Sequence, residues 1–490
     1  MHGGSDVYRF GPFELDSAHR RLLRGREPVA LPDRHADVLL LLASNAGHVV
    51  TKEALFASVW RDVAVTDNTI ERAIWNLRKT LGTQADGAPY IETQVRLGYR
   101  FVATVERGKP RQSNVALDAL LAPYRAFVEG RAALETLDRH AVIRARQAFE
   151  EALRAAPDNP AAHIGMANAC ALAFESTRTD AAPDLTSLQR ADRHAREGCR
   201  LDPSSGEAWS TLAFVLNRSG NGSEAIAAAR NALTLEPDVW QHSLRLASVS
   251  WGDQRLRAAQ RVLTLCPKLA LAHWFAATVF VARQAFDAAI KHLRDGCAAQ
   301  DAQRHGAKRF HAVGLHLLHG LVLGARGAVD DALEQFAREL AAMDEDHLYA
   351  RECGATTWYA RGALLLRRGR QDDAEAAFHE ALTRMPSHAL AAIGLAAISQ
   401  ASHAQPIRSG ANTRLRPGSG GQAVDGAMAH AAILALAGKH HDAARLCGDA
   451  LAKAEPGPAG WLLPVDPLLH VTAHHEAWAQ TLATLRQGAA

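Results

Sequence analysis

The 490-residue chain has little that would mark a disulfide-rich, membrane-spanning or polycationic protein. Its six cysteines are scattered and form no Cys-x-x-Cys pair, which argues against a disulfide framework or a zinc ribbon and fits a reducing, cytoplasmic environment. No run of about 18 apolar residues and no apolar signal core are present, so neither a membrane-spanning helix nor a leader is expected. Because the formal net charge is only +3, any contact with nucleic acid has to come from a local basic face.

Catalytic and metal-binding motifs are missing as well. The sequence contains no GxxxxGK(S/T), GxSxG or HExxH motif and no GxGxxG after a predicted strand, so it predicts neither an enzyme nor a bound cofactor. Two histidine pairs have helical spacing, His316 with His319 and His470 with His474, but neither has cysteine or carboxylate partners at ligand spacing. The favoured interpretation is a solvated helix face, and no metal is predicted.

The first 105 residues combine strand-like and helical patterns. Alternation over residues 8–15, followed by residues 21–23 and 29–31, predicts short antiparallel strands. Pro32-Asp33 opens one helix that Asn45-Ala-Gly47 ends, and Thr51 is a suitable N-cap for a second helix from Lys52 to Trp60. A third helix begins at Thr66 or Asp67 and stops at Gly82, and a hairpin covers residues 91–102. The order of strands, three helices and hairpin predicts a small α+β domain over residues 1–105.

The third helix is predicted to have two different faces. At about 100° per residue, one face carries Ile70, Ile74, Leu77 and Leu81 and should pack against the first two helices. The opposite face carries Asn68, Arg72, Trp75, Asn76 and Lys79, with Arg78 on the flank. Arginine and asparagine can bond base edges in a major groove, and basic side chains can neutralise phosphates. An ordinary solvated helix face is the alternative, although an exposed tryptophan between basic residues favours a contact surface.

The hairpin offers a second basic element. Arg96 lies near its tip and Arg100 just beyond the turn, so the hairpin could reach a minor groove. A charged edge strand that blocks aggregation is the alternative.

The remainder of the chain is predicted to be a solenoid of helical repeats. Residues 106–116 are polar and predict a linker, and residues 117–487 are rich in alanine and leucine. Pro203 and Pro237 lie 34 residues apart, and residues 355–388 form a second strict copy of the tetratricopeptide pattern. Small residues at the repeat offsets let paired helices approach, and large ones such as Phe378 fill the groove of the next pair. Residues 400–426, rich in Gly, Ser and Arg, predict a disordered insertion.

Such arrays bind peptides or proteins on a concave face formed by the first helix of each pair. In the phase of the repeats, candidates for that face are Asn217, Arg218, Trp274, Tyr359 and Arg367. The alternative is that some of them pack between repeats.

Residues 8–103 resemble the OmpR/PhoB winged-helix output domain along nearly their whole length. The matching stretches are FGPFELD, LPDRHADVLLLLASNAGHVVTKEALFASVW, VTDNTIERAIWNLRKTLG and IETQVRLGYRF. The resemblance implies that Thr66–Leu81 is the recognition helix, with Arg72, Trp75, Asn76 and Lys79 facing DNA, and that residues 91–101 form the wing. It also implies that the loop of Arg61, Asp62, Val63, Ala64 and Val65 touches RNA polymerase.

The sequence departs from the family pattern in two places. No receiver domain precedes the winged helix, so control by phosphorylation is not expected, and Val95 occupies the usual position of the wing arginine, with Arg96 offset by one. With a winged helix at its amino terminus, the chain resembles the CadC, ToxR and HilA-like regulators in domain order. Because no membrane helix is predicted, the HilA-like arrangement is the most similar.

These observations favour a cytoplasmic transcription regulator that binds promoter DNA. Its repeats would bind a partner protein or ligand and so transmit a signal to the winged helix. By resemblance, a homodimer on tandem half-sites is expected. The competing hypothesis is a non-enzymatic scaffold in which the winged helix binds protein rather than DNA.

Overall fold

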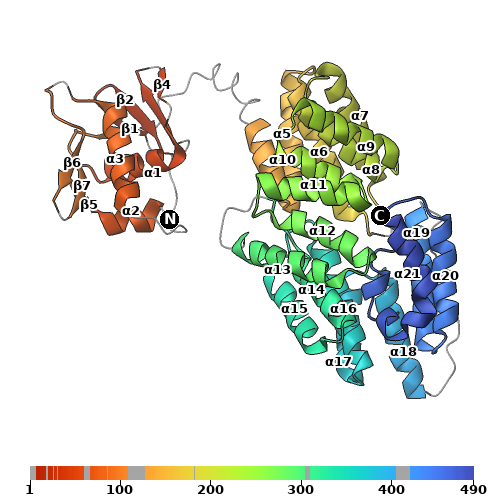
Figure 1. The fold of residues 1–490 in the computed structure, drawn as a ribbon. Helices are drawn as coiled ribbons and strands as arrows, with labels where there is room; N and C mark the ends of the chain where they lie inside the picture. Colours follow the sequence, from red (N-terminus) through yellow and green to blue (C-terminus); the bar gives the residue numbers. More distant parts are fainter. Residues whose placement is uncertain are drawn as a thin grey trace. The chain divides into compact units, whose positions relative to one another are not determined.

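The computed structural model divides the chain into two compact units, Met1–Leu121 and Ala122–Ala490, here called the N-terminal unit and the repeat unit. Figure 1 shows strands together with helices in the N-terminal unit and a succession of helices in the repeat unit. The structure describes residues 7–17, 20–25, 27–29, 31–59, 67–84, 86–95, 97–108, 127–180, 182–303, 310–403 and 420–490.

The larger sheet of the N-terminal unit is antiparallel, with strand order β4-β3-β2-β1-β8. Its strands are β1 Val7–Phe10, β2 Phe13–Asp16, β3 Arg21–Arg24, β4 Glu27–Val29 and β8 Glu106–Gly108. The strands predicted near the amino terminus are confirmed, and the last of them falls two residues earlier than expected. Strand β8 corrects the predicted linker, which was expected to begin at residue 106. By pairing with β1, it occupies backbone donors and acceptors that an edge strand would leave open.

The rest of the N-terminal unit comprises three helices and a small sheet with strand order β5-β7-β6. The elements are α1 Asp33–Ser44, α2 Lys52–Val59, α3 Asp67–Leu81, β5 Val49–Thr51, β6 Ile91–Gln94 and β7 Gly98–Phe101. The Thr51 cap is confirmed, because its Oγ1 accepts a hydrogen bond from the backbone N–H of Ala54 at 3.2 Å. Gly82 ends α3 with a positive φ of 70°, as a helix-stopping glycine should. Strand β5, which the sequence pattern did not predict, ties the start of α2 to the hairpin.

The buried face of α3 forms the centre of this unit. Ile70, Ile74, Leu77 and Leu81 are each at most 2% exposed and pack with side chains of α1 and α2. Burial of one such side chain contributes about 1.5–3 kcal/mol, so this face fixes the rotation of α3 about its axis. The opposite face must therefore point outward.

The repeat unit is a series of helices that pack mainly against their neighbours in sequence. They are α5 Arg139–Ala155, α6 Pro160–Thr177, α7 Leu185–Leu201, α8 Gly206–Arg218, α9 Gly222–Leu235, α10 Trp240–Val249, α11 Gly252–Leu265, α12 Ala270–Ala282, α13 Phe286–Gln303, α14 Leu315–Ala325, α15 Val329–Ala342, α16 Ala350–Arg367, α17 Gln371–Arg384, α18 Ala389–His403, α19 Gly420–Leu436, α20 His440–Lys453 and α21 His475–Gly488. Residues 127–135 are also helical, and Leu463–Val465 and Val471–His474 form single 3₁₀ turns.

Glycine and phenylalanine at fixed repeat positions explain the close pairing of these helices. Phe149, Phe336 and Phe378 are fully buried, as the repeat pattern predicts. A Cβ atom on Gly165 would lie 2.2 Å from the ring of Phe149, and one on Gly320 would lie 2.4 Å from the ring of Phe336. Only glycine leaves room for these rings.

Long-range contacts join distant parts of the repeat unit. Arg283, after α12, donates two hydrogen bonds to the carbonyl of Ala489 at 2.8 and 2.6 Å, which holds the end of α21. The loop before α16 contacts the loop before α5, where the N–H of Leu348 donates to the carbonyl of Leu137 at 2.8 Å. These bonds tie the end of α21 to α12 and the loop before α5 to the loop before α16.

The predicted insertion at residues 400–426 is helical at both of its ends. Helix α18 extends to His403 and α19 starts at Gly420, so regular structure reaches further into this stretch than its composition suggests. Residues 404–419 lie outside the described part of the chain. Over the described ranges, no helix has both the length and the apolar character that crossing a bilayer requires.

Candidate nucleic-acid interface

The outward face of α3 carries an exposed tryptophan between basic side chains. Trp75 is 59% exposed, and the Nζ atom of Lys79 lies 5.3 Å from the centre of its ring. Arg72, one turn earlier, is also exposed. Leaving so large an apolar ring in water is unfavourable, so the face has the character of a contact surface rather than of a solvated helix.

Two side chains on this face keep their hydrogen-bonding groups available. Within the described residues, neither Arg72 nor the side-chain amide of half-buried Asn76 has a hydrogen-bond partner. Glu71, the acidic neighbour of Arg72, lies 3.3 Å from the Nζ of Lys52 on α2, which reduces its repulsion of an approaching anion. The face can therefore offer both a guanidinium and an amide to a polyanion.

Arg78 has a structural role that the sequence pattern did not predict. Its Nε donates to the carbonyl of Ile91 at 3.0 Å, and its Nη2 donates to Oγ1 of Thr93 at 2.8 Å. Both acceptors belong to β6, so Arg78 fastens the hairpin to α3. Among the described residues, Nη1 of Arg78 has no hydrogen-bond partner, so its contact with a phosphate stays a prediction.

The hairpin is held tightly at its base, and two apolar residues near its tip are exposed. Gly98 lies against β5, where a Cβ atom would be 2.1 Å from the carbonyl oxygen of Val50, so no larger residue fits. Arg100 forms an ion pair with Glu92 at 2.8 Å across the hairpin, and its charge is therefore partly compensated. At the tip, Val95 is 80% and Leu97 is 60% exposed.

Some predicted residues fall outside what the structure describes. These are the loop Arg61–Val65, Arg96, and the side chain of Asn68, whose backbone belongs to the first turn of α3.

The five candidates for a ligand face on the repeats lie in three different helices and have different environments. Asn217 and Trp274 are half-buried, whereas Arg218 is exposed and its Nε lies 2.8 Å from Glu175. Arg367 donates to Nε2 of His470. Tyr359 is only 2% exposed and donates to the carboxylate of Asp466 at 2.8 Å, so it packs within the array and cannot face a ligand.

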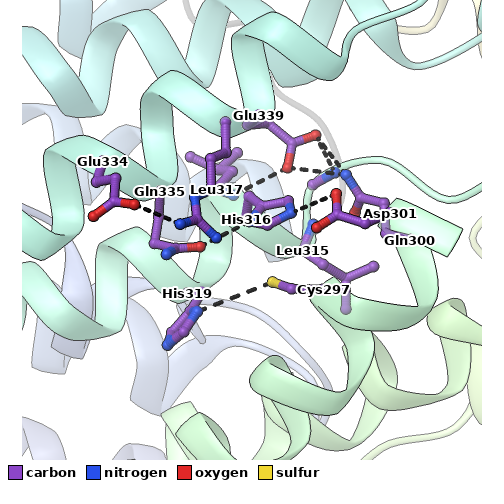
Figure 2. Close-up of polar contacts among 12 residues, drawn as sticks. Cys297, Gln300, Asp301, Leu315, His316, Leu317, His319, Glu334, Gln335 and Glu339 are labelled. Carbon is purple, nitrogen blue, oxygen red and sulfur yellow. Dashed lines mark hydrogen bonds and ion pairs between the residues drawn. The ribbon is translucent and has the colours of Figure 1, made fainter. Parts of the chain in front are cut away.

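A buried carboxylate on α15 organises the start of α14, as Figure 2 shows. Glu339 is 1% exposed, and it accepts hydrogen bonds from the N–H groups of Gly314 at 2.8 Å and Leu317 at 3.2 Å. Amide groups at a helix amino terminus lack partners within the helix and favour a negative charge. Glu339 thus caps a neighbouring helix and joins α14 to α15.

Two histidines and a cysteine lie near this carboxylate (Figure 2). His316 lies between Oε1 of Gln335 at 2.7 Å from its Nδ1 and Oδ1 of Asp301 at 3.1 Å from its Nε2. Burial lowers the pKa of His319 to about 4 and raises the pKa of the Cys297 thiol, so both are neutral near pH 7. A protonated thiol is a poor nucleophile, which gives the network a structural character. In the described part of the chain, no three His, Cys, Asp or Glu side chains are grouped as metal ligands.

Comparison with known proteins agrees with the geometry of the N-terminal unit. Residues 25–101 match the family described as "Transcriptional regulatory protein, C terminal". Over 80 residues the chain is 38% identical to the transcriptional regulator HilA of Salmonella typhimurium, which covers 16% of this chain and 14% of HilA. Over 92 residues it is 34% identical to the cholera toxin homolog transcriptional activator of Vibrio parahaemolyticus, covering 18% of this chain and 32% of that protein. The crystal structure of the Klebsiella pneumoniae RstA DNA-binding domain in complex with the RstA box is 34% identical, with a TM-score of 0.18, and the match covers 20% of this chain and 96% of that one.

The N-terminal unit is therefore a winged-helix DNA-binding domain of the OmpR/PhoB type, with α3 as its third helix and β6–β7 as its wing. The predicted resemblance is confirmed, and a large all-helical array of paired helices follows the domain. The chain spans about a third or less of the length of the two regulators it matches, and the matched part is confined to this domain.

Proposed function

We propose that this protein is a transcription regulator that binds promoter DNA through α3. The observation that carries the proposal is the outward face of that helix, where Arg72, Trp75 and Lys79 are exposed while the opposite face is buried. A helix of this kind fits the major groove, which is about 12 Å wide.

Each side chain on this face has a chemically distinct task. The fork of Arg72 can bond O6 and N7 of guanine, and the amide of Asn76 can bond N6 and N7 of adenine. Trp75 can contact thymine methyl groups or sugars, and Lys79 a phosphate. Arg78 keeps the wing in place so that the hairpin meets the adjacent minor groove. Asn68, Arg78, Arg96 and Arg100 are further candidates for DNA contacts, and the loop Arg61–Val65 for RNA polymerase.

The repeat unit would supply regulation. A partner protein or ligand that binds the array in one arrangement of the two units shifts the population towards that arrangement. We propose that a homodimer occupies tandem half-sites and that the protein acts in the cytoplasm.

The first test measures binding of the full chain to genomic fragments by selection and by fluorescence anisotropy. The R72A/N76A double variant should lose enrichment of specific fragments while its circular dichroism stays unchanged. K79A should lower the affinity for all fragments by the same factor, and it should reduce the slope of log affinity against log salt by about 1. R21A, which removes a positive charge from strand β3 of the larger sheet, is the matched control and should bind like wild type.

A second candidate function is favoured by the wing tip. Val95 and Leu97 are exposed apolar residues where DNA contact would favour basic ones, so the winged helix could instead bind protein as part of a scaffold. Affinity for DNA should fall steeply between about 50 and 200 mM salt if α3 contacts phosphates. A flat salt response, or no DNA binding at all, would support the scaffold.

A further inference from the structure

A cluster of charged side chains occurs where α6, α8 and α10 meet the start of α16. Helix α8 packs against both α6 and α10, and all three are first helices of their pairs. The cluster consists of Glu175, Arg178, Arg218, Arg245, Tyr349 and Glu352. Neither the DNA-binding proposal nor the packing of apolar side chains between repeats accounts for it.

Both carboxylates of this cluster form ion pairs with Arg178 or Arg218. Glu175 is 3% exposed, and it accepts a hydrogen bond from the hydroxyl of Tyr349 at 3.0 Å. The Nε of Arg218 lies 2.8 Å from one of its oxygens, and that of Arg178 lies 3.5 Å from the other. Arg178 also donates to Glu352. Among the described residues, neither glutamate forms an ion pair with the third arginine.

Arg245 is that third arginine. Its guanidinium forms no hydrogen bond or ion pair with any residue that the structure describes, and its Nε is shielded from solvent. The guanidinium carbon lies 4.2 Å from the centre of the Phe214 ring, and that of Arg218 lies 5.3 Å from the same ring. Burial, with a contribution from the charge of Arg218, lowers the pKa of Arg245 to about 10, so the side chain stays charged near pH 7.

The cluster therefore holds one more positive than negative charge. Three arginines face two glutamates, and burial raises the pKa of Tyr349, which keeps that residue neutral. A buried polar group without a hydrogen-bond partner is costly, and the Nε of Arg245 is such a group although Glu175 attracts the charge of its guanidinium. Attraction to the face of Phe214 offsets only part of that cost.

We propose that Arg218 and Arg245 bind an anionic group, a carboxylate or a phosphate, beside the ring of Phe214. The planar guanidinium matches both groups because two parallel N–H donors meet two oxygens. The bound anion neutralises the excess positive charge of the cluster. The proposal deepens the regulatory role suggested for the repeats, since it gives the chemistry of their ligand, and it can be tested without DNA.

The experiment titrates the full chain with inorganic phosphate and, separately, with succinate, at constant ionic strength held with sodium chloride. Isothermal calorimetry should show saturable binding with a millimolar Kd. At about ten times that Kd, the Tm of the repeat unit should rise by about 2 °C, as expected for a ligand that binds only the folded state. Tighter binding of phosphate than of succinate indicates a phosphorylated ligand, and the reverse order indicates a carboxylate.

Three variants locate the site. R245Q should weaken phosphate binding at least tenfold and, without phosphate, should have the Tm of wild type or a higher one, because the unpaired charge is gone. R245K keeps the charge but loses the planar fork, so its binding should weaken by about fivefold. R200Q is the control, since Arg200 is an exposed residue of α7 whose one ion-pair partner among the described residues is Glu197, and it should bind phosphate like wild type.

Equal binding of phosphate by wild type and R245Q would overturn the proposal. So would the absence of any saturable binding of either anion, or a clearly lower Tm of R245Q without phosphate, which would make Arg245 a structural partner of Phe214. If R245Q does not fold, the phosphate affinity of R245K is compared with that of wild type instead, and equal affinities would overturn the proposal. Selection of genomic fragments should be unaffected in R245Q, so failure here is distinct from failure of the DNA-binding proposal.

Discussion

Replacement of Glu339 by glutamine tests how strongly one side chain joins two helices of the array. The carboxylate accepts the N–H of Gly314 on Oε1 and the N–H of Leu317 on Oε2. An amide of the same shape has only one acceptor oxygen. In E339Q, one backbone N–H of α14 therefore loses its acceptor and faces an NH₂ donor.

The expected loss of stability follows from these contacts. A hydrogen bond to a charged group contributes about 1.5–3 kcal/mol. The lost negative charge at the amino terminus of α14 adds about 0.3–1 kcal/mol. Burying a neutral amide costs less free energy than burying a carboxylate, and this difference offsets part of the lost stability. The free energy of unfolding should fall by about 2–3 kcal/mol in total.

Urea unfolding of the full chain, followed by circular dichroism at 222 nm, measures this loss mainly in the repeat unit. The midpoint should shift while the slope stays constant. The control is E334Q, on the same helix, because Glu334 is exposed and, in the part of the chain that the structure describes, pairs with Arg338 alone, one turn away. Such a pair contributes about 0.3–0.5 kcal/mol. If E339Q unfolded at the same urea concentration as E334Q, the capping role of Glu339 would be refuted.

Three further predictions concern the wing and the response to acid. R78A should lower DNA affinity and free the hairpin, seen as faster amide hydrogen exchange in β6, and unchanged exchange would contradict the tether. G98A should destabilise the N-terminal unit by at least about 2 kcal/mol, because a Cβ meets backbone there, and a thermal melt matching wild type would exclude the clash. Burial lowers the pKa of His319, His347 and His388 to about 4, below the 6.5 of an unfolded histidine. The unfolded chain therefore binds more protons between these values, and stability should fall as pH drops from about 6.5 to 4, by about 3 kcal/mol for each histidine. A urea midpoint that is the same at pH 7 and pH 5 would contradict this.

Local periodicity was sufficient to predict the two faces of α3. The side chains of Ile70 and Leu77 recur at helical spacing, so burial of one face implied exposure of Trp75 on the other. The repeat pattern likewise predicted which positions need small residues and which need rings, because those contacts lie within one pair or between neighbouring pairs.

Contacts between distant segments could not be predicted in this way. The bonds from Arg78 to β6 depend on how the hairpin folds back on α3, and the pairing of β8 with β1 joins residues about a hundred positions apart. Tyr359 has the right phase for a ligand face, yet it meets Asp466, which lies 107 residues further along the chain. The cluster of charged side chains around Arg245 combines residues from four helices, so no single stretch of sequence could predict it.

The most direct test of the central claim is DNase footprinting on genomic DNA with the full chain and its R72A/N76A variant. The account predicts discrete protected sites for wild type, and loss of that protection in a variant that remains folded. Protection retained by the double variant, or no protection by wild type even at low salt, would contradict DNA reading by α3.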